Sequence, residues 1–212
     1  MQYILKVNNM IKNSGKLYKL EKSLYSIIKY CPLSPNMITV LSLIFALFAF
    51  ILAYLDFHIY HTLGLIFLAS IIDAVDGIVA RAKNQVSKKG AFLDGIADRI
   101  VEFFVLLILL KWIVLKGIIG YLITIDIQII SILFFGTCMT SFVKAYAEHR
   151  QVLSHEKAVK LKGLLERAER VGLIFIALLS ILFAPLYTSY IVFLIFILTI
   201  FTFLQRMYYV LR

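Results

Sequence analysis

Long apolar runs separated by short polar segments make up most of this chain. Six of these runs approach or reach the length that a helix needs to cross a bilayer, at about 37–55, 62–81, 91–114, 118–143, 171–184 and 188–208. Continuous runs of this kind are longer than the core face of a soluble helix requires. The pattern predicts an all-α integral membrane protein with six transmembrane helices.

The first 35 residues follow a different pattern. Residues 1–35 place six lysines among Ile and Leu at near-helical spacing, which predicts an amphipathic helix lying on the membrane surface. The tripeptide Ser34-Pro35-Asn36 is predicted to end that helix. The fourth span is predicted to continue past the membrane surface into the polar segment 144–170, which also has a helical pattern. No internal repeat or change in composition divides the chain, so we interpret 1–212 as a single membrane domain.

The chain carries a net charge of +10, with 22 Lys and Arg against 12 Asp and Glu. All of the basic residues except Lys111 and Lys116 lie in or beside segments that this topology places on one side of the membrane. By the positive-inside rule, both termini and segments 82–90 and 144–170 are expected to be cytoplasmic. Because the 62% hydrophobic composition and the mean hydropathy of +0.93 indicate a multi-pass protein of the cell membrane, we attribute the basic excess to topology and expect no nucleic-acid partner.

Four aspartates stand at the ends of two predicted spans. Asp73 and Asp76 lie in the last turns of the second span, and Asp94 and Asp98 lie in the first turns of the third. The second span runs toward the cytoplasm and the third returns from it, so all four carboxylates are expected at a similar depth. Their three- and four-residue spacings place each pair on one helix face. Carboxylates inside membrane segments are costly and indicate a functional site.

Four like charges at one depth need a cation between them. Oxygen ligands with no nearby His or Cys favour Mg²⁺ or Mn²⁺ over zinc, and four carboxylates are enough for two ions. A two-metal site stabilises the attacking and leaving oxygens of a phosphoryl displacement, so a pyrophosphate substrate is expected. Gly77, Ala80, Gly90 and Gly95 would leave room for such a ligand, although small-residue helix packing would also explain them.

The spacing of these residues resembles the signature of the CDP-alcohol phosphatidyltransferase family. The pattern D-x-x-D-G-x-x-A-R, eight residues, then G-x-x-x-D-x-x-x-D is met by Asp73, Asp76, Gly77, Ala80, Arg81, Gly90, Asp94 and Asp98. A Pro-Asn-x-x-Thr entry to the first span, at Pro35, Asn36 and Thr39, agrees with it. The resemblance implies a six-span, usually homodimeric membrane enzyme that transfers the phosphatidyl group of a CDP-linked lipid to an alcohol and releases CMP.

The resemblance also implies roles for individual residues. The first three aspartates would bind metal, and Asp98 would bind metal or act as the base that activates the acceptor hydroxyl. The CDP-lipid contacts would be Asn36, Thr39, Gly77, Arg81 and Ser87. Arg81 can offer phosphate a bidentate contact, with snorkelling to the interface as the alternative. Ser87 would alternatively be a solvated turn residue.

A second group of basic residues bears on the acceptor alcohol. Arg167 and Arg170 are three residues apart before the fifth span, and Glu166 is predicted to hold the Arg170 guanidinium through its four-residue spacing. Several positive charges near the metal site suit an acceptor that carries phosphate, although the usual cytoplasmic positive fringe would also place basic residues here. The predicted phosphate contacts are Lys144, Arg167, Arg170 and Arg206.

Three short motifs, Lys-Ala-x-Ala-Glu, Glu-Arg-x-Glu-Arg and a terminal Gln-Arg, resemble the branch of the family that makes phosphatidylinositol phosphate or archaetidylinositol phosphate. That branch uses inositol 1-phosphate, and it has a basic residue where this chain has Tyr146. The preferred function is therefore transfer of a diacyl- or dialkylglycerol phosphate group to inositol 1-phosphate, with the surrounding membrane lipids as further partners.

Other functions stay open at this stage. The same chemistry could use glycerol 3-phosphate, or CDP-inositol with inositol phosphate. Remote alternatives are a cation transporter built on the aspartates and a basic adaptor on the membrane surface. The apolar surfaces of Leu, Ile and Phe do not distinguish acyl ester from isoprenoid ether tails.

Overall fold

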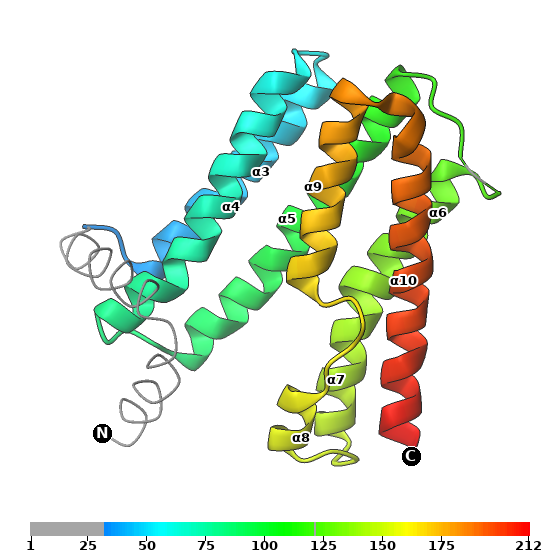
Figure 1. Cartoon of the computed structure of the whole chain (residues 1–212). Coiled ribbons are helices and arrows are strands. Elements are labelled where there is room, and N and C mark those ends of the chain that lie inside the picture. Colours follow the sequence, from blue (N-terminus) through cyan, green and yellow to red (C-terminus); the bar gives the residue numbers. More distant parts are fainter. Residues whose placement is uncertain (1–31, 121) are drawn as a thin grey trace, which may run out of the picture. The chain divides into compact units, whose positions relative to one another are not determined.

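The computed structural model describes residues 32–120 and 122–212, and within them every regular element is a helix (Figure 1). The predicted surface helix falls on residues 1–35, most of which lie outside this part of the chain. The helices are α3 (Pro35–Tyr54), α4 (Ile59–Ala82), α5 (Lys88–Leu115), α6 (Ile125–Ser131), the π-helix η1 (Ile132–Met139), α7 (Thr140–His149), α8 (His155–Lys160), α9 (Arg167–Phe183) and α10 (Pro185–Leu211).

Four helical stretches in the described residues are long and apolar enough to cross a membrane. They are α3, α4, the continuous stretch Ile125–His149 and α10. The predicted third and fifth spans correspond to α5 and α9, which fall outside this group because α5 carries charges along its first half and α9 has 17 residues. The count of six spans therefore stays a prediction, whereas the all-helical membrane class is confirmed.

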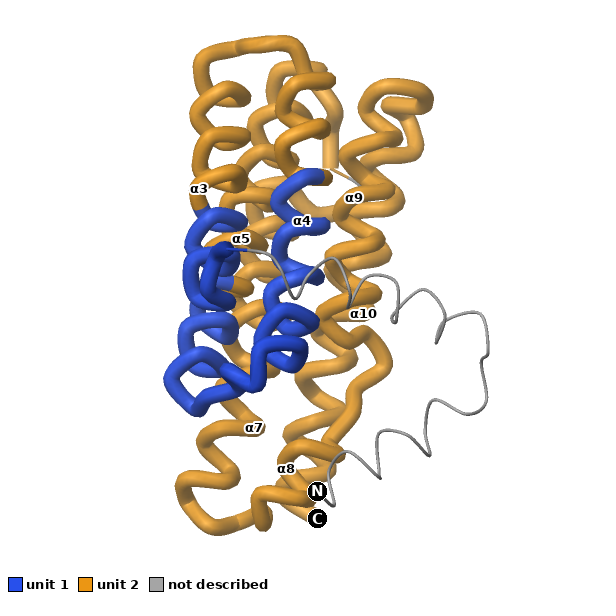
Figure 2. Tube along the Cα trace, turned by 90° about the vertical axis from the view of Figure 1, so that its left-hand side faces the viewer, with its two compact units in different colours: residues 1–43, 68–97 blue, residues 44–67, 98–212 orange. Residues whose placement is uncertain are grey.

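The chain divides into two compact units (Figure 2). Unit 1 contains Met1–Leu43 and Leu68–Ala97, and unit 2 contains Ile44–Phe67 and Asp98–Arg212. The boundaries cross α3, α4 and α5, so each of these helices contributes one end to each unit.

Unit 1 has a small apolar core between the start of α3 and the end of α4. Its members are Leu33, Ile38, Ile72, Val75, Ile78, Val79 and Ala82. Burial of such side chains stabilises the unit by roughly 25 cal/mol for each Å² of apolar surface removed from water. This core lies on the same turns of α4 as Asp73 and Asp76, and it therefore fixes the position of these aspartates.

Local signals in the sequence set the ends of the helices in unit 1. The Ser34 hydroxyl accepts a hydrogen bond from the Met37 N–H at 3.3 Å, and Pro35 occupies the first helical position. The tripeptide Ser34-Pro35-Asn36 therefore marks the start of α3, and the helix that it is predicted to end lies outside the described residues. At the other end, Asn84 adopts a left-handed φ of 54°, which lets the Gln85 N–H reach the Ala80 carbonyl and ends α4.

Unit 2 is built around α10, which packs against α9, η1, α6 and α7. A short turn joins α9 to α10, and the Ser180 and Thr188 hydroxyls hydrogen-bond across it at 2.7 Å. Large aliphatic side chains that are almost wholly buried form its core: Leu106, Ile108, Leu109, Ile113, Ile132, Ile174, Leu178, Ile181, Val192 and Ile195. The predicted apolar spans supply all of these residues.

The π-helix η1 interrupts the stretch Ile125–His149 where α10 lies closest. A Cβ atom on Gly136 would stand 2.9 Å from Thr199 Cγ2 and 3.1 Å from Arg170 Cδ. The missing side chain is what allows these groups to approach, and single π-helical turns of this kind are frequent at functional sites. The sequence pattern gave no sign of this irregularity.

Two predictions about the fourth span are wrong. Residues 118–120 and 122–124 are not helical, and the helix begins only at Ile125, because Gly117 adopts a left-handed φ of 63° after the end of α5. The segment 144–170 is not continuously helical either. It contains the end of α7, the six-residue α8, and a non-helical stretch 161–166, in which the Leu164 and Leu165 N–H groups bond to side chains of α10.

Candidate metal and phosphate site

Three aspartates in unit 1 come together as their spacing predicted. Ligand oxygens of Asp73 and Asp76 on α4 and of Asp94 on α5 all lie within 4.8 Å of one another. Asp76 is buried and the other two are half-buried. Their donors are all carboxylate oxygens, so the cluster fits a hard divalent cation such as Mg²⁺ or Mn²⁺.

Thr39 contacts this cluster directly. Its hydroxyl donates to Asp76 Oδ2 at 2.6 Å, and both side chains are buried. The sequence placed Thr39 among the nucleotide contacts, and the structure adds a contact with a predicted metal ligand. A hydroxyl that donates to one carboxylate oxygen orients that carboxylate and leaves its other oxygen for a cation.

The other predicted CDP-lipid contacts lie in two small groups of unit 1. A Cβ on Gly90 would stand 3.1 Å from Ser87 Oγ and 3.2 Å from Asn36 Oδ1, so these three residues meet at the start of α5. A Cβ on Gly77 would have the Arg81 guanidinium at 3.4 Å as its neighbour. Ser87 also accepts a hydrogen bond from the Gly90 N–H at 3.0 Å, so it acts as an N-cap of α5.

Asp98 follows Asp94 by one turn of α5 and belongs to unit 2. Its Oδ1 lies 2.7 Å from a terminal nitrogen of Arg167 on α9, and its Oδ2 lies 3.5 Å from Arg99. Arg99 in turn donates to the Ser141 hydroxyl at 2.8 Å. The predicted base and one predicted phosphate ligand thus contact each other in this structure.

Arg170 is paired with a residue that the sequence reasoning missed. Its Nε and a terminal nitrogen donate to the two carboxylate oxygens of Glu102 at 2.5 and 3.1 Å, and both side chains are buried. Glu102 stands one turn after Asp98 on α5, and this four-residue spacing was the one available signal. The predicted partner of Arg170, Glu166, is wrong, since Glu166 contacts Arg206 instead.

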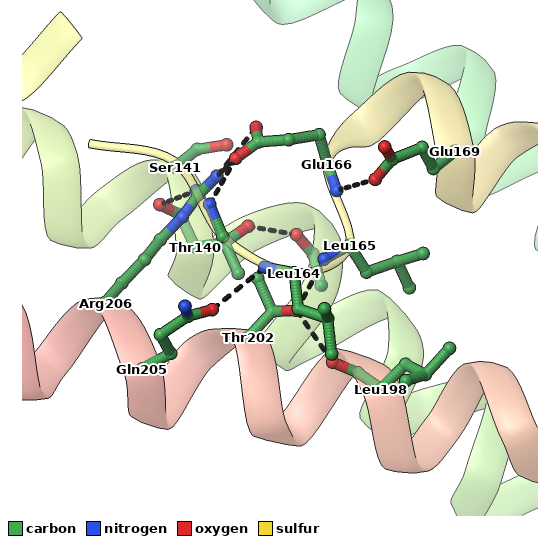
Figure 3. A network of polar contacts seen from close by, with 12 residues as sticks. Thr140, Ser141, Leu164, Leu165, Glu166, Glu169, Leu198, Thr202, Gln205 and Arg206 are labelled. Atoms are coloured by element: carbon green, nitrogen blue, oxygen red, sulfur yellow. Dashed lines mark hydrogen bonds and ion pairs between the residues drawn. The ribbon is translucent and has the colours of Figure 1, made fainter. Parts of the chain in front are cut away.

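Arg206 is the centre of a polar network that joins α10 to the segment before α9 (Figure 3). Its guanidinium donates to both carboxylate oxygens of Glu166, at 2.8 and 2.9 Å, and to the Thr140 carbonyl at 2.7 Å. The Leu164 and Leu165 N–H groups donate to Gln205 and Thr202 on α10. This network holds the segment that leads into Arg167.

The electrostatics of Glu166 follow from these contacts. Partial burial raises the pKa of its carboxyl, but hydrogen bonds from the Gly163 N–H and from Arg206 outweigh burial and hold the pKa below its usual value. Lys144 on α7 is half-buried and close enough to Glu166 and Arg206 to interact with both. All four predicted phosphate contacts therefore lie on α7, α9 and α10 of unit 2.

Tyr146 stands where the resemblance implies a basic residue, and an arginine contacts it. Arg150, the C-cap residue of α7, donates to the Tyr146 hydroxyl at 2.9 Å and lies over its ring at 5.3 Å. Phe142 also stacks on Tyr146, with ring centroids 5.1 Å apart. This stack brings a positive charge to the exposed face of α7.

Apolar helices of membrane-spanning length and a cluster of three carboxylates define a membrane protein with a site suited to a divalent cation. The family model described as CDP-alcohol phosphatidyltransferase matches residues 32–205. The chain belongs to this family.

Individual relatives agree with this assignment. The chain is 32% identical over 177 residues to archaetidylinositol phosphate synthase of Pyrococcus horikoshii, a match that covers 83% of this chain and 82% of the relative. The fold of the present chain is similar to that of phosphatidylinositol phosphate synthase of Mycobacterium tuberculosis with CDP-DAG bound. The two chains are 22% identical, the TM-score is 0.64, and the match covers 91% of this chain and 92% of the other. The same enzyme with manganese and citrate gives a TM-score of 0.58 at 23% identity, over 91% and 88% of the chains.

Proposed function

We propose that this chain transfers a diacyl- or dialkylglycerol phosphate group from a CDP-linked lipid to inositol 1-phosphate and releases CMP, with Mg²⁺ or Mn²⁺ bound. The observation that carries the proposal is the cluster of Asp73, Asp76 and Asp94 in a chain of this family. The choice of acceptor is supported by the relative and the two similar structures, all of which are named as synthases of inositol phosphate lipids.

The aspartates are the proposed metal ligands, with Asp98 as the fourth and two ions in all. Bound cations would neutralise the diphosphate of the donor and stabilise the leaving phosphate oxygen. Thr39 keeps Asp76 in a fixed orientation through its 2.6 Å hydrogen bond. The manganese bound by the similar structure supports a divalent cation.

The proposed CDP-lipid site consists of Asn36, Thr39, Gly77, Arg81 and Ser87. Asn36 and Ser87 flank Gly90, where even a methyl group would press on both side chains. Gly77 would leave room for the nucleotide beside the guanidinium of Arg81, which can bind a phosphate in a bidentate manner.

Asp98 and Arg167 are proposed to act on the acceptor together. The acceptor phosphate competes with Asp98 for the Arg167 guanidinium, and the carboxylate then receives the proton of the acceptor hydroxyl. The hydroxyl oxygen bonds to the phosphorus that carries the lipid, the bond from that phosphorus to the CMP oxygen breaks, and CMP leaves with the electron pair. Lys144, Arg170 and Arg206 complete the positive surroundings of this phosphate.

A reconstitution assay tests the proposal. Purified protein receives Mn²⁺ or Mg²⁺ and a CDP-lipid, with either inositol 1-phosphate or glycerol 3-phosphate as the acceptor. In a third reaction, CDP-inositol replaces the CDP-lipid as the donor and inositol phosphate is the acceptor. Release of CMP and the mass of the lipid product are measured. We expect product with inositol 1-phosphate, and consumption of glycerol 3-phosphate alone would assign a different acceptor.

Asp98→Asn is the variant that tests the base. We expect turnover to fall by about 100-fold or more, in the range that general-base catalysis contributes, while size-exclusion elution in detergent stays as in the parent protein. Activity close to the parent level would remove both the base role and the metal role of Asp98 and leave the other assignments intact.

We further propose that the protein is a homodimer in the cell membrane, with both termini and the active site on the cytoplasmic side. The distribution of Lys and Arg along the chain supports the orientation, and the homodimer is what membership of the family implies. A reporter that matures only in the cytoplasm, fused after Arg212, should be active, and light scattering in detergent should give the mass of two chains. If the reporter after Arg212 is inactive and a reporter inserted at residues 116–118 is active, the orientation is the reverse of the one proposed.

A further inference from the structure

The buried pair of Glu102 and Arg170 is the most enclosed ionic contact in the described residues. Glu102 is 3% exposed and Arg170 is 4% exposed. Two donor nitrogens of the guanidinium face the two oxygens of the carboxylate at 2.5 and 3.1 Å. A fork of this kind fixes the orientation of both side chains as well as their distance.

The surroundings keep Arg170 in this orientation. Its Cδ and Nε lie 3.1 and 3.3 Å from the position that a Cβ on Gly136 would take, and Thr199 lies at 2.9 Å from the same point. The side chain therefore lies against Gly136 of η1 and reaches Glu102 on α5. To contact a ligand, the guanidinium would have to leave the carboxylate, and both charges would lose their partner in a buried place.

A second pair lies on the same two helices. Asp98 and Glu102 are one turn apart on α5, and Arg167 and Arg170 are nearly one turn apart on α9. The Asp98–Arg167 contact of 2.7 Å is the more open of the two, since the Arg167 side chain is 38% exposed and that of Arg170 is 5% exposed. The inner pair thus sets the position of the first turn of α9, from which the outer arginine reaches Asp98.

We propose that Glu102 and Arg170 form a positioning pair, which places Arg167 against Asp98 without contacting the acceptor itself. The inference rests on the proposed function and changes the role of one residue within it. Arg167 and Lys144 then supply the direct phosphate contacts, and Arg170 acts through the geometry of α9. Glu102 becomes a residue on which acceptor binding depends.

Replacement of both members of the pair separates positioning from direct contact. The double variants Glu102→Gln with Arg170→Gln, and Glu102→Met with Arg170→Met, keep two side chains of similar length and remove both charges. A buried ion pair can often be replaced in this way without loss of the fold, whereas removal of one partner is strongly destabilising. Each double variant is compared with Arg170→Gln alone, using CMP release at varied acceptor and varied CDP-lipid concentrations.

We expect the single Arg170→Gln variant to raise the KM for inositol 1-phosphate by about tenfold or more and to leave the KM for the CDP-lipid nearly unchanged. At least one double variant should return the acceptor KM to within about threefold of the parent value, because a neutral pair no longer leaves a buried carboxylate without its partner. Arg167→Gln should raise the acceptor KM in every background. Arg150→Gln, an arginine in the exposed stack on α7, is the matched control and should change neither KM.

The proposal is overturned if both double variants bind the acceptor as poorly as Arg170→Gln, because a direct phosphate contact would be lost in each of them. Failure of both double variants to fold would also contradict the proposal, since a positioning pair requires only that neither side chain is left without a partner. A parent protein that consumes no phosphorylated alcohol at all would count against the proposed function instead. The two failures are thus distinguishable.

Discussion

Sequence spacing predicted some contacts at the carboxylate cluster and missed others. Asp73, Asp76 and Asp94 were predicted to meet because helical periodicity fixes their faces, and they do meet. The hydrogen bond of Thr39 to Asp76 joins residues 37 positions apart. No local pattern specifies a contact of that range, so it emerged only from the packed chain.

Thr39→Val tests whether this contact supports a metal site. Loss of the hydroxyl leaves the Asp76 carboxylate without its orienting donor, and we expect Mn²⁺ affinity to fall by about 10- to 100-fold, as for other residues that orient a metal ligand. Isothermal titration with Mn²⁺ measures the effect, and Thr39→Ser, which keeps the hydroxyl, should stay near the parent value. Equal affinities for the Val and Ser variants would rule out this role.

Glu166 gives the stability a defined dependence on pH. Its pKa is lower in the folded protein than in the unfolded chain, so the unfolded state takes up a proton first as the pH falls. The stabilisation is complete at neutral pH and is lost below about pH 4, as the pH passes the ordinary Glu value and then the folded one. Thermal unfolding between pH 7 and pH 3 should show this loss, and Glu166→Gln should make the curve flatter. A variant with the same acid slope as the parent would show that other carboxylates are responsible.

At the scale of the helices, the apolar pattern predicted which segments are helical far better than it predicted where each helix begins or how it winds. Each of the six expected spans overlaps a helix, because a long run of Leu, Ile and Phe that crosses a membrane must be helical, although the number of spans stays a prediction. The start of α6 at Ile125 and the π-helix were missed, since Gly117 and Gly136 act through conformation and close packing rather than through polarity. The pairing of Arg170 with Glu102 spans 68 residues, and the position of Glu102 one turn after Asp98 was its one local signal.

Gly136→Ala tests the packing of η1 against α9 and α10. A methyl group there meets Thr199 and Arg170, and overpacking of this kind costs about 1–3 kcal/mol. The variant should unfold at a lower temperature in detergent. Gly172→Ala on α9 is the control, because a Cβ at Gly172 has no neighbour within 4 Å, and it should be neutral or slightly stabilising by helix propensity. Similar unfolding temperatures for the two variants would contradict the close approach.

At the scale of the whole molecule, the metal should couple to stability. A cation that binds only the folded cluster stabilises it by mass action, by about 2.7 kcal/mol at a concentration 100 times its dissociation constant. We expect Mn²⁺ to raise the unfolding temperature of the chelator-treated protein and CMP to raise it further. Asp94→Asn should lose most of the Mn²⁺ effect. An unfolding temperature that is insensitive to Mn²⁺, with and without CMP, would remove the divalent cation from the proposal.

The π-helix also has a consequence for comparison among relatives. Each residue of an α-helix turns the chain by about 100°, whereas a π-helical turn holds one more residue in about the same rotation. Loss of one residue between Ile132 and Met139 would therefore restore regular winding and leave α7 in the same orientation relative to α6. The residue in the place of Lys144 would still lie near Glu166 and Arg206, but at a position one lower in the shorter chain. A homologue that is one residue shorter here thus needs an alignment gap inside an unbroken apolar stretch, and a gap-free alignment would match the wrong side chains throughout α7.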